Sequence, residues 1–181
     1  MNRSWNTRTL VEAGLCLALS FVLGRIKLFS MPQGGSVTAG QMIPLIFFAI
    51  RHGAGKGIIV GIAYGLLDMT IGGSIYHPVQ AILDYPAAFG FLGLAGLFSK
   101  KFFEENDVMP VVYGTVLGVF ARFICHTLTG VIFFGSYAPE GQNVWAYSAG
   151  YNGTFLAVEL AITIVLIFLL RNVLTKDLKN M

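Results

Sequence analysis

Apolar residues fill most of the chain in long runs that short polar or glycine-rich segments separate. A helix of about 20 apolar residues is long enough to cross the hydrocarbon core of a bilayer. The pattern predicts six spans, of which the second is short, over residues 10–29, 42–50, 58–71, 79–98, 108–134 and 149–170. We therefore expect an all-α integral membrane protein whose six helices form one bundle, as a single domain over residues 1–181.

The composition supports a protein of the cell membrane. Hydrophobic residues make up 55% of the 181 positions, charged residues 12%, and the mean hydropathy is +0.71. Soluble domains carry about 25% charged residues. Six spans and their loops leave no room for a separate soluble domain, and the scattered net charge of +3 gives no reason to expect a nucleic-acid partner.

The basic residues predict the orientation of the bundle. The connecting segments 30–41, 72–78 and 135–148 contain no Lys or Arg. Most basic residues fall at the opposite ends of the predicted spans, at Arg3, Arg8, Arg51, Lys56, Lys100, Lys101, Arg171, Lys176 and Lys179. Because cytoplasmic segments of membrane proteins are enriched in Lys and Arg, both termini are predicted to be cytoplasmic and the three segments without Lys or Arg to lie outside.

The fifth span contains two polar residues that need a reason to be there. Arg122 and His126 are four residues apart, so they share one face of a helix, which Thr129 and Phe133 continue. An ionisable side chain in a bilayer costs about 2.5–3.5 kcal/mol and normally faces a partner or a water-filled cavity. Arg122 can be structural, paired with a carboxylate on a neighbouring helix, whereas His126 favours a functional role.

The fourth span contains a carboxylate next to a helix-breaking residue. Asp84 and Tyr85 directly precede Pro86, whose ring removes one helix hydrogen bond and frees the carbonyl of Ile82. A carboxylate, a phenol and a free carbonyl therefore gather within about one helical turn.

These polar residues fall in the outer half of the predicted bundle. At a rise of about 1.5 Å per residue, Asp84, His126 and Tyr64 lie roughly 8–12 Å from the outer ends of their spans. Tyr147 and Asn152 mark the outer start of the last span, and several aromatic residues lie nearby, at Tyr85, Phe133, Phe134 and Trp145. The pattern indicates a pocket that opens to the outside.

The residue types indicate what such a pocket could bind. One carboxylate among aromatic faces favours a flat cationic ligand. The amide of Asn152 and the hydroxyl of Tyr147 can orient a heteroaromatic ring. The alternative is that each polar residue forms an ordinary interhelical hydrogen bond, and that Arg122 and Glu159 neutralise each other.

Four segments of the chain resemble a known family. They read MPQGGSVT, HPVQAILDYPAAFGFLGLAGLF, ARFICHTLTGVIFFGSYAPEG and YSAGYNGT, and they resemble the thiamine-specific substrate-binding (S) components of energy-coupling factor (ECF) vitamin transporters. The resemblance runs from the first span to the last. It implies a six-helix protein that binds thiamine from outside and is energised by a transmembrane coupling subunit and two cytoplasmic ATPases.

The resemblance also implies roles for individual residues. Residue by residue, the ligand-contacting positions of the family match Tyr64, Asp84, Tyr85, His126, Phe134, Tyr147 and Asn152. The carboxylate of Asp84 is set against the positive thiazolium ring, and Phe134 stacks on the ligand. Tyr147 and Asn152 hold the aminopyrimidine.

The chain departs from the family pattern at several positions. Members of the family can carry Glu at position 84 and Trp at positions 64 and 134, so Tyr64 and Phe134 offer a smaller stacking area here. The first outer segment, 30–41, is a lid in the family and can supply an acid and a Trp. Here it offers only Gln33, Ser36 and Thr38.

The first span has a pair of small residues, Gly14 and Ala18, four positions apart. Such a pair lets another helix approach closely, either within the bundle or on a partner protein. The resemblance implies that this face docks on the coupling subunit.

Three other interpretations remain open at this stage. An intramembrane enzyme could use Asp84, Asp68 and His126, although the sequence has no metal-ligand motif and implies no cofactor. A purely structural subunit would bind nothing in the pocket. An S component for a related vitamin or a pyrimidine precursor would have the same fold.

Overall fold

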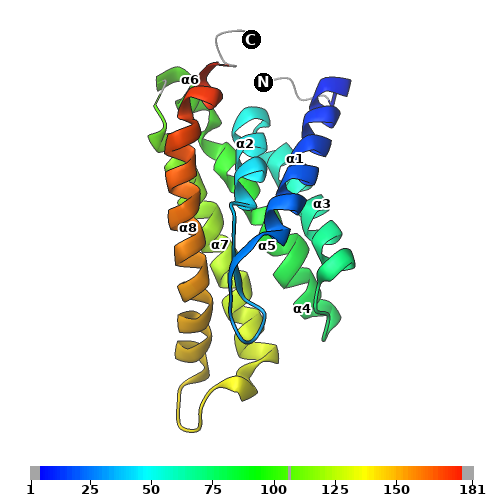
Figure 1. Cartoon of the computed structure of the whole chain (residues 1–181), viewed down its shortest axis with the longest axis vertical. Helices are drawn as coiled ribbons and strands as arrows, with labels where there is room; N and C mark the ends of the chain where they lie inside the picture. The colour runs from blue at the N-terminus through cyan, green and yellow to red at the C-terminus, as the bar shows by residue number, and fades with distance from the viewer. Residues whose placement is uncertain (1–4, 106, 177–181) are drawn as a thin grey trace.

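The computed structural model describes residues 5–105 and 107–176, and shows a helical bundle with one small hairpin (Figure 1). Its long helices are α1 (Thr7–Arg25), α3 (Ala54–Gly72), α7 (Met109–Phe133) and α8 (Val144–Lys176). Between them lie the short helix α2 (Met42–His52), the 3₁₀ turn η3 (Gly135–Tyr137) and a segmented fourth span. The all-α membrane fold is confirmed by this arrangement.

The described residues include five helices that are long and apolar enough to cross a membrane. The predicted second span, α2, is an apolar helix of only 11 residues, most of which are buried among the other helices. A helix buried in this way needs no lipid-facing surface. Residues 42–50 therefore form a helix as predicted, but one that is too short to be counted as a spanning segment by length.

The fourth span changes its helix type along its length. It runs through α4 (Pro78–Ile82), the π-helical turn η1 (Leu83–Ala87), α5 (Ala88–Gly90), the 3₁₀ segment η2 (Phe91–Phe98) and α6 (Ser99–Glu105). Pro86 has no N–H to donate, and the N–H of Ala88 bonds to the carbonyl of Leu83, five residues back. The widened turn contains Asp84 and Tyr85.

The predicted loop 30–41 is an ordered hairpin, which corrects the sequence-based expectation. Strand β1 (Lys27–Ser30) pairs antiparallel with β2 (Ser36–Thr38). The first span was predicted to reach Phe29, but α1 ends at Arg25. Leu28 and Phe29 are apolar, so they read as a continuation of the helix, whereas both side chains are exposed on β1.

The last helix also begins earlier than expected. It starts at Val144 rather than at residue 149, so Tyr147 belongs to α8 rather than to the preceding loop. Asn143 explains the earlier start, because its side-chain oxygen accepts hydrogen bonds from the N–H groups of Trp145 and Ala146.

The first and last helices place the described ends of the chain at the same end of the bundle (Figure 1). The start of α1 and the end of α8 lie there, and at this end Glu12 of α1 contacts Arg51 and His52 of α2, at 3.2 and 2.7 Å. The hairpin and the connection between α7 and α8 extend toward the other end. Arg3 and Lys179, which contribute to the predicted orientation, lie outside the described residues.

Two glycines of α3 allow the fourth span to approach closely. A Cβ added to Gly65 would lie 2.5 Å from the carbonyl carbon of Tyr85 and 2.6 Å from the Cα of Pro86. A Cβ on Gly61 would meet the backbone of Phe89 and Gly90. The backbone of the π-helical turn therefore rests directly on α3.

Replacement of Gly65 should displace this turn. We expect Gly65→Ala to lower the thermal unfolding temperature of the purified protein, because overpacking of this kind costs about 1–3 kcal/mol. Gly150→Ala is a matched control, since no atom lies within 4 Å of a Cβ added there. Equal melting temperatures for the two variants would contradict the close approach.

Candidate functional site

A cavity of about 700 Å³ lies between the hairpin, the first part of the fourth span, α7 and the start of α8. Most of the residues that the sequence marked as ligand-contacting line it: Asp84, Tyr85, His126, Phe134, Tyr147 and Asn152. Residues that are far apart in the sequence therefore meet in one place. The predicted pocket is present.

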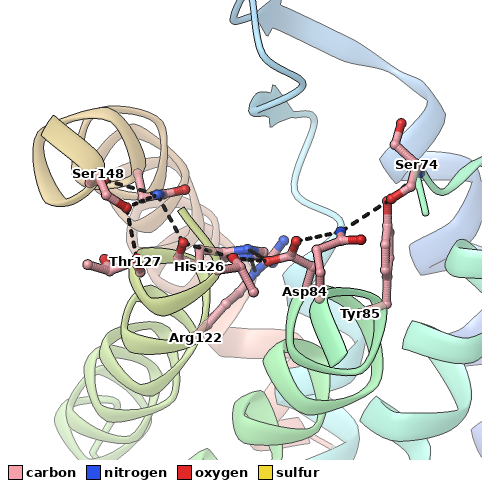
Figure 2. A network of polar contacts seen from close by, with 10 residues as sticks. Ser74, Asp84, Tyr85, Arg122, His126, Thr127 and Ser148 are labelled. Atoms are coloured by element: carbon pink, nitrogen blue, oxygen red, sulfur yellow. Dashed lines mark hydrogen bonds and ion pairs between the residues drawn. The ribbon is translucent and has the colours of Figure 1, made fainter. Parts of the chain in front are cut away.

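The carboxylate of Asp84 is held from two sides (Figure 2). Its Oδ1 lies 2.9 Å from Nδ1 of His126 and accepts a 2.6 Å hydrogen bond from the hydroxyl of Thr129, both on α7. Its Oδ2 accepts a 2.7 Å bond from the amide of Gln80, one turn earlier on α4. These donors fix the orientation of the carboxylate and tie the fourth span to α7.

The contact between Arg122 and His126 orients the imidazole. Nε of Arg122 donates to Nε2 of His126 at 3.2 Å. Guanidinium groups only donate, so Nε2 accepts, and Nδ1 carries the hydrogen that points to Asp84. His126 therefore links the guanidinium of Arg122 to the carboxylate of Asp84.

Arg122 itself faces both the cavity and the neighbouring helix. It is only 5% exposed, its guanidinium carbon lies 4.1 Å from the ring centroid of Phe89, and it lines the cavity. Its Nη1 also lies 4.0 Å from Oε2 of Glu159 on α8. Arg122 therefore lies beside a carboxylate of another helix, as predicted, and also forms part of the cavity wall.

Tyr85 and Gln80 hold the segment between α3 and α4. The phenol oxygen of Tyr85 accepts the N–H of Ser74 at 2.7 Å (Figure 2). Gln80 donates to the carbonyl of Ser74 and accepts from the N–H of Tyr76. Gln80 also bonds to Asp84, and Tyr85 is its neighbour in sequence, so the segment between α3 and α4 and the carboxylate form one connected unit.

Asn152 uses its amide nitrogen within the protein. The nitrogen donates to the carbonyl oxygens of His126 and Ser148, at 3.2 and 3.0 Å. Its amide oxygen has no hydrogen-bond partner among the described residues. The bonds of the nitrogen fix the orientation of the amide, so its oxygen can accept a hydrogen bond from a ligand at the cavity wall.

Aromatic rings form much of the remaining wall. Phe134 stacks on Tyr137 with an interplanar angle of 9° and meets the edge of Tyr76. On α8, Tyr151 lies between Tyr147 and Phe155, with centroid distances of 6.3 Å to each. The cavity therefore combines a carboxylate with several aromatic faces.

Tyr64 does not line the cavity, in contrast to the expectation from the sequence. It is 0% exposed and packs edge-on against Phe89, with ring centroids 4.6 Å apart. Its hydroxyl lies 3.3 Å from the carbonyl of Ser20 and from Oε1 of Gln41. The close approach of α3 to the fourth span puts Phe89 between Tyr64 and the cavity, so Tyr64 supports the wall.

The hairpin is attached to α8 at its tip and at its base. The hydroxyl oxygen of Tyr151 accepts the N–H groups of Gln33 and Gly35, at 3.1 and 3.2 Å. Glu159 accepts the N–H and hydroxyl of Thr38. Of the polar residues expected in this segment, Gln33 and Ser36 line the cavity, whereas Thr38 is buried against α8.

Several residues of the cavity were not among those marked as ligand-contacting from the sequence. Gln80, Thr129, Tyr151 and Phe155 all line the cavity. A signal was available, because Gln80 precedes Asp84 by four residues and Tyr151 and Phe155 follow Tyr147 at the same spacing. Asp68, whose role the sequence left open, forms a 2.6 Å ion pair with Arg25 at the cavity wall.

Two further expectations can be compared with the structure. Gly14 and Ala18 are exposed on α1, and no atom lies within 4 Å of a Cβ added to Gly14. These small residues therefore do not serve packing inside the described bundle. Across residues 5–105 and 107–176, no group of three or more His, Cys, Asp or Glu side chains is placed to hold a metal ion.

Comparisons with known proteins give the family. A family model described as thiamine transporter protein (Thia_YuaJ) matches residues 10–179. The chain belongs to this family. It is 34% identical over 180 residues to the thiamine transporter ThiT of Bacillus subtilis, covering 94% of this chain and 93% of that protein. It is 33% identical over 180 residues to ThiT of Lacticaseibacillus paracasei, covering 91% and 85%.

A solved structure agrees with these relatives. The chain superposes on ThiT from Listeria monocytogenes with a TM-score of 0.82 and 29% identity, covering 96% of this chain and 99% of that one. The resemblance to thiamine-specific S components is thus confirmed, and the chain is a multi-pass membrane protein. Because the relatives are named as transporters, the interpretation as an intramembrane enzyme is set aside.

The attachment of the hairpin tip can be tested directly. Tyr151→Phe removes the acceptor of two N–H groups, and one hydrogen bond contributes about 1 kcal/mol. We expect amide hydrogen exchange in residues 33–35 to become several-fold faster in this variant. Tyr147→Phe is the control, because Tyr147 lies one turn away and has no hydrogen bond to the hairpin. Unchanged exchange in Tyr151→Phe would show that these bonds do not hold the tip.

Proposed function

We propose that this protein is the high-affinity thiamine-capture subunit of an ECF-type importer. It binds thiamine from the outer side and passes it through the membrane together with a transmembrane coupling subunit and two cytoplasmic ATPases. The observation that carries the proposal is the fixed carboxylate of Asp84 in an aromatic cavity, in a chain of the thiamine transporter family. Thiamine leaves chemically unchanged.

The size of the cavity fits a ligand of this kind. Small-molecule sites usually enclose about 300–1,000 Å³, and the cavity here has about 700 Å³. Thiamine is a flat aminopyrimidine joined to a cationic thiazolium ring. Both rings can lie against aromatic side chains, which suits the walls formed by α7 and α8.

Asp84 supplies the charge that a cationic ring requires. Its carboxylate is oriented by His126 and Thr129 and faces the thiazolium. Phe134 stacks on the ligand from the end of α7, where Tyr137 supports it from behind. A cation over an aromatic face gains about 0.5–2 kcal/mol, and more when water is excluded.

The start of α8 suits the aminopyrimidine. The amide oxygen of Asn152 is available to accept from the exocyclic amine, and the hydroxyl of Tyr147 can donate to or accept from the ring. Tyr85 lies on the opposite wall, beside Asp84. Tyr64 acts indirectly, by supporting Phe89 and Gln41.

The exposed face of α1 with Gly14 and Ala18 supplies the surface for the coupling subunit. The small side chains let a partner helix approach closely. No packing inside the described bundle accounts for them.

Calorimetry of the purified protein tests the proposal. Thiamine should bind with one-to-one stoichiometry, and riboflavin should give no heat. The free pyrimidine moiety distinguishes an S component for a precursor, because it would then bind more tightly than thiamine. No heat with thiamine in folded, ligand-free protein would overturn the proposal.

The carboxylate is tested by removing its charge. Asp84→Asn should weaken thiamine binding more than tenfold, which corresponds to about 1.4 kcal/mol, because the amide keeps the size of the side chain but cannot balance a cation. Asp107→Asn is the control, since Asp107 is exposed and outside the cavity lining. Equal affinities for wild type and Asp84→Asn would remove Asp84 from the proposed site.

The docking face is tested by adding bulk on α1. Gly14→Leu should leave thiamine binding unchanged and abolish uptake in cells that contain the partner subunits. Gly150→Leu adds the same bulk to an exposed glycine of α8 and should leave uptake intact. Normal uptake with Gly14→Leu would argue against docking through this face.

A further inference from the structure

A cavity proposed to bind a cation contains a buried positive charge. Arg122 lines the wall and is only 5% exposed, and its guanidinium is always protonated. A like charge beside a cationic ligand opposes binding, all the more where water is excluded. If nothing balanced Arg122, it would cancel the charge of Asp84.

Glu159 lies where it can supply this balance. It is on α8, is 3% exposed and does not belong to the residues that line the cavity. Its Oε2 lies 4.0 Å from Nη1 of Arg122. Both atoms are buried, and neither has a hydrogen-bond partner among the described residues. These two atoms of opposite charge therefore face each other, and no hydrogen bond to another described residue draws either of them away.

The hairpin fixes the direction of the Glu159 carboxylate. Its Oε1 accepts the N–H of Thr38 at 2.8 Å and the hydroxyl of Thr38 at 2.6 Å. Bonds from two donors of one residue leave a carboxylate little rotational freedom. Oε2 is consequently held toward Arg122, and the negative charge stays behind the cavity wall, out of reach of a ligand.

The other charges around the cavity do not replace Glu159. Arg25 and Asp68 form an ion pair with each other at 2.6 Å. His126 contacts Arg122, but an imidazole carries no negative charge that could balance the guanidinium. Lys27 is exposed on β1, where solvent screens its charge. The balance at the inner wall therefore depends on Asp84, Arg122 and Glu159.

We propose that Glu159 is a specificity-determining residue, which neutralises Arg122 and so leaves the charge of Asp84 for a cationic ligand. The proposal rests on the function proposed above and adds a residue that does not touch the ligand. It predicts that loss of Glu159 weakens binding of a charged ligand far more than binding of a neutral one of the same shape.

A matched pair of ligands tests this. The first is thiamine, and the second is its neutral analogue in which a thiophene ring replaces the thiazolium. In Glu159→Gln, which keeps an oxygen for Thr38, affinity for thiamine should fall at least tenfold. Affinity for the neutral analogue should change less than threefold. A merely structural defect would weaken both ligands equally, and that result would overturn the proposal.

Two further variants complete the test. Thr163→Val removes a buried hydrogen bond to the carbonyl of Glu159, one turn along α8, without changing any charge. It should leave the ratio of the two affinities unchanged. The double variant Arg122→Gln with Glu159→Gln removes both charges, and its ratio should return to within threefold of wild type. If Glu159→Gln does not fold, the double variant decides. A ratio of thiamine affinity to analogue affinity that is tenfold below the wild-type ratio then overturns the proposal.

The outcome for the wild type separates this inference from the function on which it rests. No binding of thiamine by the wild type would overturn the proposed function and this inference with it. Tight binding of thiamine by the wild type, with an equal loss of both ligands in Glu159→Gln, would leave the function standing and overturn the role of Glu159 alone.

Discussion

A carboxylate within a membrane protein has to be surrounded by donors, and this requirement governs how the halves of the bundle meet around Asp84. Two of the donors, His126 and Thr129, come from α7, and the third, Gln80, comes from α4. The side chain thus joins the fourth span to α7 while remaining at the cavity wall. The contact that holds these elements together is also the feature that gives the cavity its charge.

The backbone around Asp84 departs from α-helical geometry because Pro86 lacks an N–H, and the widened turn needs room on its other side. Gly65 of α3 provides this room, since any larger residue would meet the backbone of Tyr85 and Pro86. A proline on one helix and a glycine on the next therefore act together. They bring Asp84 and Tyr85 to the cavity and place Phe89 over Tyr64.

Much of the site could be predicted from the sequence, and the failures have physical causes. Arg122 and His126 were recognisable because charged or titratable residues are costly in an apolar span. Gln80 and Thr129 gave a weaker signal, their helical spacing alone, because amides and hydroxyls in such spans commonly bond within the bundle. Tyr64 is kept out of the cavity by the close approach of α3 to the fourth span, which a local sequence pattern does not reveal. The hairpin was missed because Leu28 and Phe29 are apolar and yet exposed, and their exposure does not follow from the local pattern either.

The two attachments of the hairpin differ in strength. At the tip, Tyr151 accepts two backbone N–H groups through a neutral hydroxyl in a partly exposed place. At the base, Glu159 accepts two bonds from Thr38 through a buried carboxylate. Hydrogen bonds to an ionised group are about twice as strong as neutral ones. The base of the hairpin is therefore held more firmly than the tip, and it keeps Glu159 directed at Arg122.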